Sequence, residues 1–124
     1  GVTPVEIQES IRRYEEEQES EARRLEIQQF AAQLEEFGIS FRELVKLSPK
    51  HRDSRLMLQK VARELAQSPE LVRAMLDKKS LPIQALLEKV EVSRKTLERH
   101  RKYIIAMGLV YIFDYPHLRE YLNP

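Results

Sequence analysis

The side chains best suited to chemistry in this chain are the cations that follow Ser93. Arginine and lysine bind phosphates, and arginine also pairs with the edge of guanine. On the helix that this segment predicts, Leu97, Ile104 and Met107 share one side, which leaves the polar side chains on the other. The residues that we expect to contact DNA are Ser93, Arg94, Lys95, Thr96, Glu98, Arg99, Arg101 and Lys102. The alternative is that this basic face is simply solvated, as on an ordinary bundle helix.

Residues 81–107 contain the parts of a helix-turn-helix that would position these cations. Residues 81–87 are mostly apolar and have a proline early, where its missing N–H costs no hydrogen bond. Residues 88–92 follow as a turn, and the two valines in it can point inward. Ser93 can then cap a long recognition helix, because its hydroxyl accepts an N–H of the next turn. In such a motif the first turns of the second helix enter the major groove of DNA.

Different side chains of this helix suit different parts of DNA. Arg94 or Arg99 is expected to pair bidentately with guanine, whereas Lys95 and Lys102 are expected to bind phosphates. Glu98 could accept a hydrogen bond from cytosine N4, or it could orient a basic neighbour one helical turn away.

A second basic group lies in the turn that follows Ser48, where a proline disfavours helix at the preceding residue. One interpretation is a purely structural turn, in which Ser48 or Asp53 bonds local amides. The other is an auxiliary contact of Lys50, His51 and Arg52 with the DNA backbone. Both interpretations stay open at this point.

Charge is divided unevenly along the 124 residues. Residues 1–36 have four basic and ten acidic side chains, a balance of −6, whereas residues 37–124 have seventeen basic and ten acidic ones, a balance of +7. Two surfaces of opposite charge are therefore expected, and the basic part is the candidate for a polyanion.

The acidic part also contains an apolar stripe of Ile7, Ile11 and Tyr14 at helical spacing. The run from Glu15 to Glu21 has no apolar residue, so the helix must cross solvent there or break. We expect residues 4–36 to contact a protein partner through this stripe. The alternative is that Ile7 and Ile11 fold back onto the domain and belong to its core.

The rest of the chain indicates an all-α fold, a compact multi-helix domain. No segment alternates convincingly with period two. Gly38 is expected to end the first long helix, and Phe41, Leu44 and Val45 are expected to point inward from a short second one. The apolar faces of the next two helices are expected to be Leu58, Val61, Ala62 and Leu65, and then Leu71, Val72, Met75 and Leu76.

Other classes of function find little support in the sequence. The three histidines lack metal-ligand spacing, no phosphate-binding glycine loop is present, and without cysteine there is neither a disulfide nor a thiolate metal site. No apolar run approaches the ~20 residues of a membrane helix, and the amino terminus lacks a signal peptide. We expect no enzyme activity, metal, cofactor or small-molecule substrate, and a cytoplasmic location.

Three blocks of residues carry a resemblance to a known family. They are Ser93–Arg99 continuing through Arg101–Ala106, Phe41–Val45 with Leu47–Asp53, and Tyr115–Leu122. These blocks resemble the sigma-I family of bacterial RNA polymerase sigma factors, over nearly the whole chain from Glu19 onward. The resemblance implies that residues 19–124 are the C-terminal helical domain of such a factor. Residues 1–18 would be a helix or linker from its upstream domain, which is absent here.

The resemblance also implies a function. An alternative sigma factor of this kind, active for example in a stress response, recognises the −35 element of promoter DNA with its C-terminal domain and docks core RNA polymerase. Family members are commonly held inactive by the cytoplasmic N-terminal segment of a membrane-anchored anti-sigma factor. The alternative function class is a purely protein-binding helical module.

Overall fold

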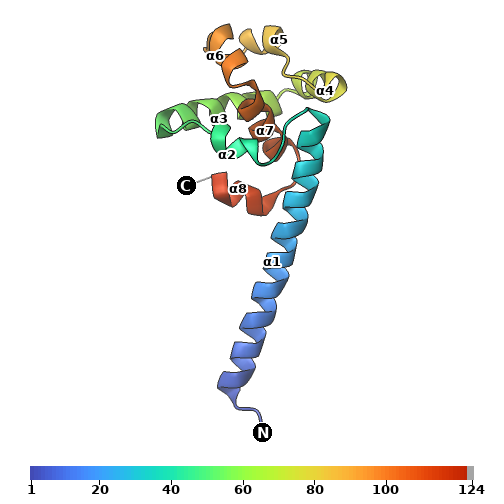
Figure 1. The fold of residues 1–124 in the computed structure, drawn as a ribbon, viewed down its shortest axis with the longest axis vertical. Helices are drawn as coiled ribbons and strands as arrows, with labels where there is room; N and C mark the ends of the chain where they lie inside the picture. The colour runs from blue at the N-terminus through green and yellow to red at the C-terminus, as the bar shows by residue number, and fades with distance from the viewer. Residues whose placement is uncertain (123–124) are drawn as a thin grey trace.

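The computed structural model describes residues 1–122, so the last two residues of the expected 19–124 domain lie outside the described range. Within residues 1–122 the chain forms eight helices and no strand (Figure 1). They are α1 (Pro4–Glu36), α2 (Glu43–Leu47), α3 (Arg52–Ala66), α4 (Pro69–Lys78), α5 (Ile83–Leu87), α6 (Arg94–Arg99), α7 (Arg101–Ile112) and α8 (Pro116–Leu122). The expected all-α fold is confirmed.

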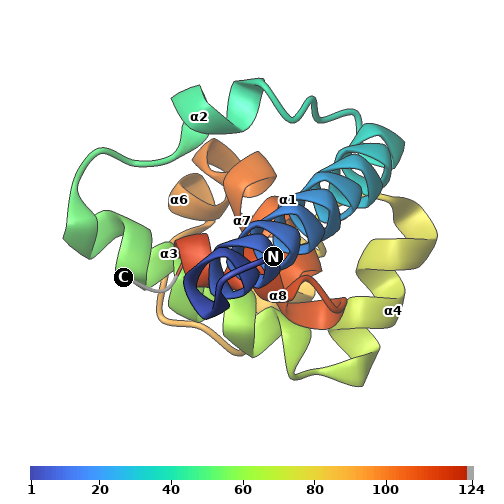
Figure 2. The same ribbon diagram turned by 90° about the horizontal axis from the view of Figure 1, so that it is seen from below.

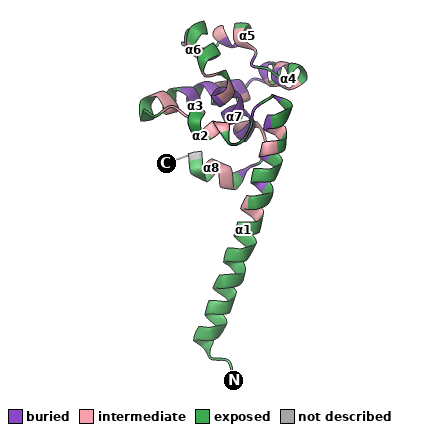
Figure 3. Ribbon diagram, in the orientation of Figure 1, coloured by how far each residue is buried: buried purple, intermediate pink, exposed green. Residues whose placement is uncertain are grey.

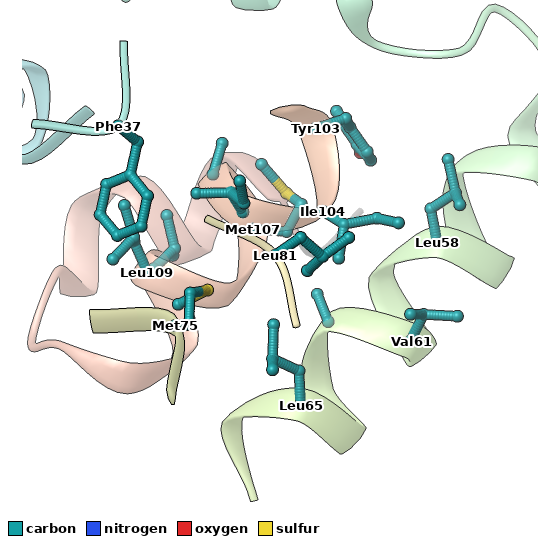
Figure 4. Packing of buried hydrophobic residues seen from close by; sticks show 14 of the residues in the cluster. Phe37, Leu58, Val61, Leu65, Met75, Leu81, Tyr103, Ile104, Met107 and Leu109 are labelled. Atoms are coloured by element: carbon teal, nitrogen blue, oxygen red, sulfur yellow. The ribbon is translucent and has the colours of Figure 1, made fainter. Parts of the chain in front are cut away.

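Helix α7 forms the centre of the domain, because eight consecutive residues from Tyr103 to Val110 are buried. A helix that is apolar on every side must be surrounded by other elements. Helix α3 packs along it with the expected stripe, including Leu58, Val61 and Leu65 (Figure 4). Gly108 allows this close approach, since a Cβ atom there would lie 3.2 Å from Cδ2 of Leu65.

Helix α1 is continuous over 33 residues, and every residue up to Glu21 is exposed (Figures 1 and 3). Its polar run therefore crosses solvent and does not break. Ile7, Ile11 and Tyr14 are 48%, 52% and 62% exposed, so the alternative that the isoleucines belong to the core is wrong. The helix ends at Glu36, and Gly38 follows in the expected left-handed conformation with φ of 72°.

Two charged side chains attach α8 to the domain through helix ends. The buried carboxylate of Glu26 in α1 accepts hydrogen bonds from the backbone N–H groups of His117 at 3.1 Å and Leu118 at 3.3 Å. The guanidinium of Arg119 donates to three carbonyls at the end of α7, at 3.1 to 3.2 Å. Backbone N–H and C=O groups at helix ends lack intrahelical partners, and Glu26 and Arg119 provide partners for them here. Figure 2 shows α8 beside α1, on the side from which α1 projects.

The short helix α2 differs in two respects from the expectation. Phe41 precedes the helix and is 37% exposed, although its ring packs edge-on against Phe30 with ring centroids 6.0 Å apart. Leu44 is partly buried against the core, as expected. Val45 is 82% exposed, so its expected inward position is wrong. Consecutive residues differ by about 100° around a helix, and a helix of five residues can turn only one narrow side toward α7.

Candidate nucleic-acid interface

Helices α5 and α6 and the turn between them form the expected helix-turn-helix. The Ser93 hydroxyl accepts a hydrogen bond from the Thr96 N–H at 3.2 Å, which confirms the predicted cap. Leu86 of α5 and Leu97 of α6 are fully buried, and the two valines of the turn pack against the core. The expected first helix begins two residues late, at Ile83, because Pro82 serves as its cap residue.

The helix that follows Ser93 is interrupted at His100, where one long helix was expected. His100 has φ of −109° and ψ of 20° and separates the six-residue α6 from α7. Its N–H still bonds the carbonyl of Thr96 at 3.0 Å, and its own carbonyl accepts from Ile104 at 3.0 Å. Helix α7 must lie along α3 to bury all its sides, whereas α6 must place Leu97 beside α5. A straight helix does not meet both requirements, so the chain turns at one residue.

The outer face of α6 is centred on Lys95 and Arg99. These residues stand two positions before and after the buried Leu97, and at about 100° per residue they lie almost opposite it. Both are exposed, and neither has a carboxylate within 4.0 Å among residues 1–122. Their cationic groups are therefore free for a ligand.

Arg94 lies to the side of this face and already has partners. Its guanidinium donates to the side-chain oxygen of Gln84 in α5 and stands 3.8 Å from a Glu98 oxygen. Glu98 thus lies beside a basic neighbour one helical turn away, the arrangement that one of its two expected roles requires.

The two cations beyond His100 belong to α7. Arg101 is exposed, but the ammonium group of Lys102 lies 2.6 Å from Oε1 of Glu43 in α2. The bond from Lys102, with further bonds from the Ser40 backbone N–H and hydroxyl, lowers the pKa of Glu43 to about 2. Lys102 therefore links α7 to α2 and, unlike Lys95 and Arg99, is not available for a ligand.

The turn at residues 48–53 leaves Lys50, His51 and Arg52 exposed. Arg55, which the sequence pattern did not single out, closes this turn by donating to the carbonyl of Lys50 at 2.7 Å and to that of the preceding proline at 3.0 Å. No side chain caps the first turn of α3 at its cap residue, His51. Among residues 1–122, the turn is thus closed by an arginine of the next helix and not by the local bonds of Ser48 or Asp53 that one of the two interpretations proposed.

An apolar groove of about 520 Å³ lies on another side of the domain, and no sequence pattern pointed to it. Helices α1, α3, α7 and α8 and the α2 region contribute to it, with Phe41, Val45, Leu56, Met107 and Tyr121 among its lining residues. Because its walls come from segments far apart in the chain, only the folded structure assembles it.

Residues 1–122 contain neither a membrane-spanning helix nor a cluster of metal-ligating side chains. No helix there combines the length and apolar character needed to cross a bilayer. Nor does this part of the chain bring together three histidine, aspartate or glutamate side chains that could hold a metal ion.

Comparison with known proteins places these features in a family, although no family model matches the chain. RNA polymerase sigma factor SigI of Bacillus subtilis (strain 168) is 47% identical over 119 residues, which are 96% of this chain and 47% of that protein. SigI7 of Acetivibrio thermocellus is 39% identical over 114 residues, 92% of this chain and 48% of its own length. SigI of Bacillus anthracis is 42% identical over 119 residues, 96% of this chain and 50% of its own length. The chain thus spans about half the length of the curated relatives it matches, and it belongs to the SigI family of RNA polymerase sigma factors as a C-terminal domain.

Proposed function

We propose that this domain recognises the −35 element of promoters within an alternative sigma factor. The observation that carries the proposal is the capped helix α6, whose outer face presents the free cations Lys95 and Arg99. A helix of this kind, held by a helix-turn-helix, reads base edges from the major groove. The membership of the chain in a sigma factor family supports DNA as the polyanion.

The role that we propose for each side chain depends on whether it already has a partner within the domain. Arg99 is the proposed guanine reader, and Lys95 is a proposed phosphate contact. Arg94 and Glu98 lie 3.8 Å apart at the edge of the same face. The hydroxyl groups of Ser93 and Thr96 lie 2.9 Å apart at the start of α6, where a phosphate or base edge can approach them.

The exposed turn residues Lys50, His51 and Arg52 are a proposed auxiliary contact to the DNA backbone. This proposal is supported by Arg55, which bonds the carbonyls of the turn, so the three side chains are not needed to close it.

The proposed protein partners are core RNA polymerase and a membrane-anchored anti-sigma factor, the latter through its cytoplasmic N-terminal segment. The exposed stripe of Ile7, Ile11 and Tyr14 on the acidic part of α1 is the proposed contact surface. Residues 1–18 are proposed to lead toward another part of the sigma factor, and residues 19–124 to form its C-terminal domain. The exposure of α1 up to Glu21 and the greater length of the relatives support this division.

A selection experiment tests the DNA-binding proposal and needs no assumption about the −35 bases. The chain, and separately the longer factor bound to core polymerase, is incubated at stated salt with duplexes randomised over one major-groove site, because phosphate contacts make affinity depend on salt. Recovery of one enriched sequence is expected. A variant with Lys95→Glu and Arg99→Glu should lose this enrichment. The matched control Arg13→Glu with Arg73→Glu should keep it, because these two arginines of α1 and α4 are also exposed and without a carboxylate within 4.0 Å among residues 1–122. Equal binding to all duplexes by every protein would favour a protein-binding module with a solvated basic helix.

A further inference from the structure

A depression of about 360 Å³ lies where the end of α2 meets the junction of α6 and α7. Its walls are Lys46 and Leu47 from α2 and the run from Glu98 to Tyr103. The two segments are about fifty residues apart in sequence, so only the folded chain brings Lys46 beside the interruption at His100.

The charge of this depression is positive once its ion pairs are taken into account. Lys46, Arg99 and Arg101 are exposed, and within residues 1–122 none of them has a carboxylate within 4.0 Å. The other charged groups are already paired: Lys102 binds Glu43, and Glu98 lies 3.8 Å from Arg94. Burial lowers the pKa of the His100 imidazole, and the charge of Arg99 lowers it further.

The interruption at His100 also leaves backbone donors without intrahelical partners at the start of α7. The first intrahelical bond of α7 runs from the Ile104 N–H to the His100 carbonyl, and no side chain caps this helix. The N–H groups of residues 101–103 therefore precede the hydrogen-bonded ladder of α7. Side-chain cations and backbone donors both suit an anionic oxygen better than a base edge or an apolar group.

We infer that this depression holds one phosphate of the DNA backbone, next to the bases that α6 contacts. The inference rests on the proposed function and extends it, because neither Lys46 nor the depression belongs to the helix-turn-helix. Arg99 borders both the outer face of α6 and the depression, so a strand whose base meets Arg99 brings a phosphate close to Lys46 and Arg101.

The test uses Lys46→Ala, Arg101→Ala and the double variant, with Arg13→Ala as a control that removes one exposed cation from α1. Binding to the selected duplex is measured by fluorescence anisotropy from about 50 to about 200 mM salt. Because Lys46 and Arg101 share one phosphate, the double variant should lose about 0.9 from the slope of log K against log salt, and each single variant should lose no more than that. Between about 50 and about 200 mM salt, the loss of affinity of the double variant should then be about 3.5-fold smaller than that of the unchanged chain. Base preference should not change, and the control should behave like the unchanged chain.

A duplex with single neutral methylphosphonate linkages locates the phosphate. One linkage should weaken binding of the unchanged chain and have no further effect on the double variant. If the double variant keeps the original salt slope while the unchanged chain still selects its sequence, the inference is overturned and the proposed function stands. If the unchanged chain selects no sequence, the proposed function fails and the inference fails with it.

Discussion

The most informative substitution is Arg99→Ala, compared with Arg94→Ala on the same helix. Both remove one arginine from α6, but the two side chains start from different states. Arg99 is free among the described residues, whereas the guanidinium of Arg94 is bonded to Gln84 and lies near Glu98. Only Arg99 can contact a guanine without giving up an existing interaction.

The expected magnitudes follow from this difference. A bidentate arginine–guanine pair contributes about 1–3 kcal/mol of discrimination, so Arg99→Ala should lower affinity for the selected duplex about 5- to 140-fold. It should relax preference at one base pair, since the lost bonds are to that base. Arg94→Ala leaves Glu98 unpaired at the edge of the DNA-facing surface, and its repulsion of phosphates should weaken binding to all duplexes about equally.

Fluorescence anisotropy against duplexes altered at one base pair at a time measures both effects at fixed salt. Circular dichroism of each variant checks that the helices are intact. The reasoning is refuted if Arg99→Ala weakens all duplexes equally while Arg94→Ala relaxes one position. In that case Arg99 would be a phosphate contact and Arg94 would leave Gln84 when DNA binds.

Three other perturbations test separate parts of the molecule. Removing Lys50 and Arg52 together, as alanines, should reduce the salt slope by up to about 1.8 with base preference intact, and an unchanged slope would leave the turn as structure only. Ile7→Ser with Ile11→Ser should leave the melting temperature nearly unchanged, because both side chains are about half exposed. The same change should weaken anti-sigma or polymerase binding by about 1 kcal/mol per residue in a pull-down or calorimetric titration, and weaker promoter binding with partner binding kept would contradict it. The pKa of Glu43 is about 2, below its ordinary 4.5, so its stabilising effect is complete above pH 4.5 and lost as pH falls toward about 2. Melting curves of Glu43→Gln should therefore lack this part of the acid dependence, and curves parallel to those of the unchanged chain would exclude it.

Predictions that depend on near neighbours in sequence were reliable in this protein. The Ser93 cap needs only a hydroxyl and the N–H of Thr96, three residues later, and the structure contains that bond. The stripe Leu58, Val61 and Leu65 follows from the period of a helix alone, and it lies in the core. The prediction that Val45 points inward was wrong, because the side on which a five-residue helix is buried depends on its neighbours in space.

Interactions between distant segments had no signature in the sequence. Glu26 reads as one more carboxylate of an acidic helix, yet it is buried and bonds a backbone N–H 91 residues away. Arg55 closes the turn at residues 48–53, for which the sequence suggested only local caps or a contact with DNA. The apolar groove and the basic depression are likewise assembled from separate helices.

Local sequence is enough to place most helix ends, to identify the apolar sides, and to show that cations gather after Ser93. These properties come from caps and periodicity, which act within one or two helical turns. The interruption of the helix at His100, and the identity of the cations that remain free, depend on tertiary packing. Lys102 looks like Lys95 in the sequence, but Glu43, 59 residues away, binds it in the fold. The availability of a charge depends on what lies within a few ångströms of it, and packing of distant segments sets that distance.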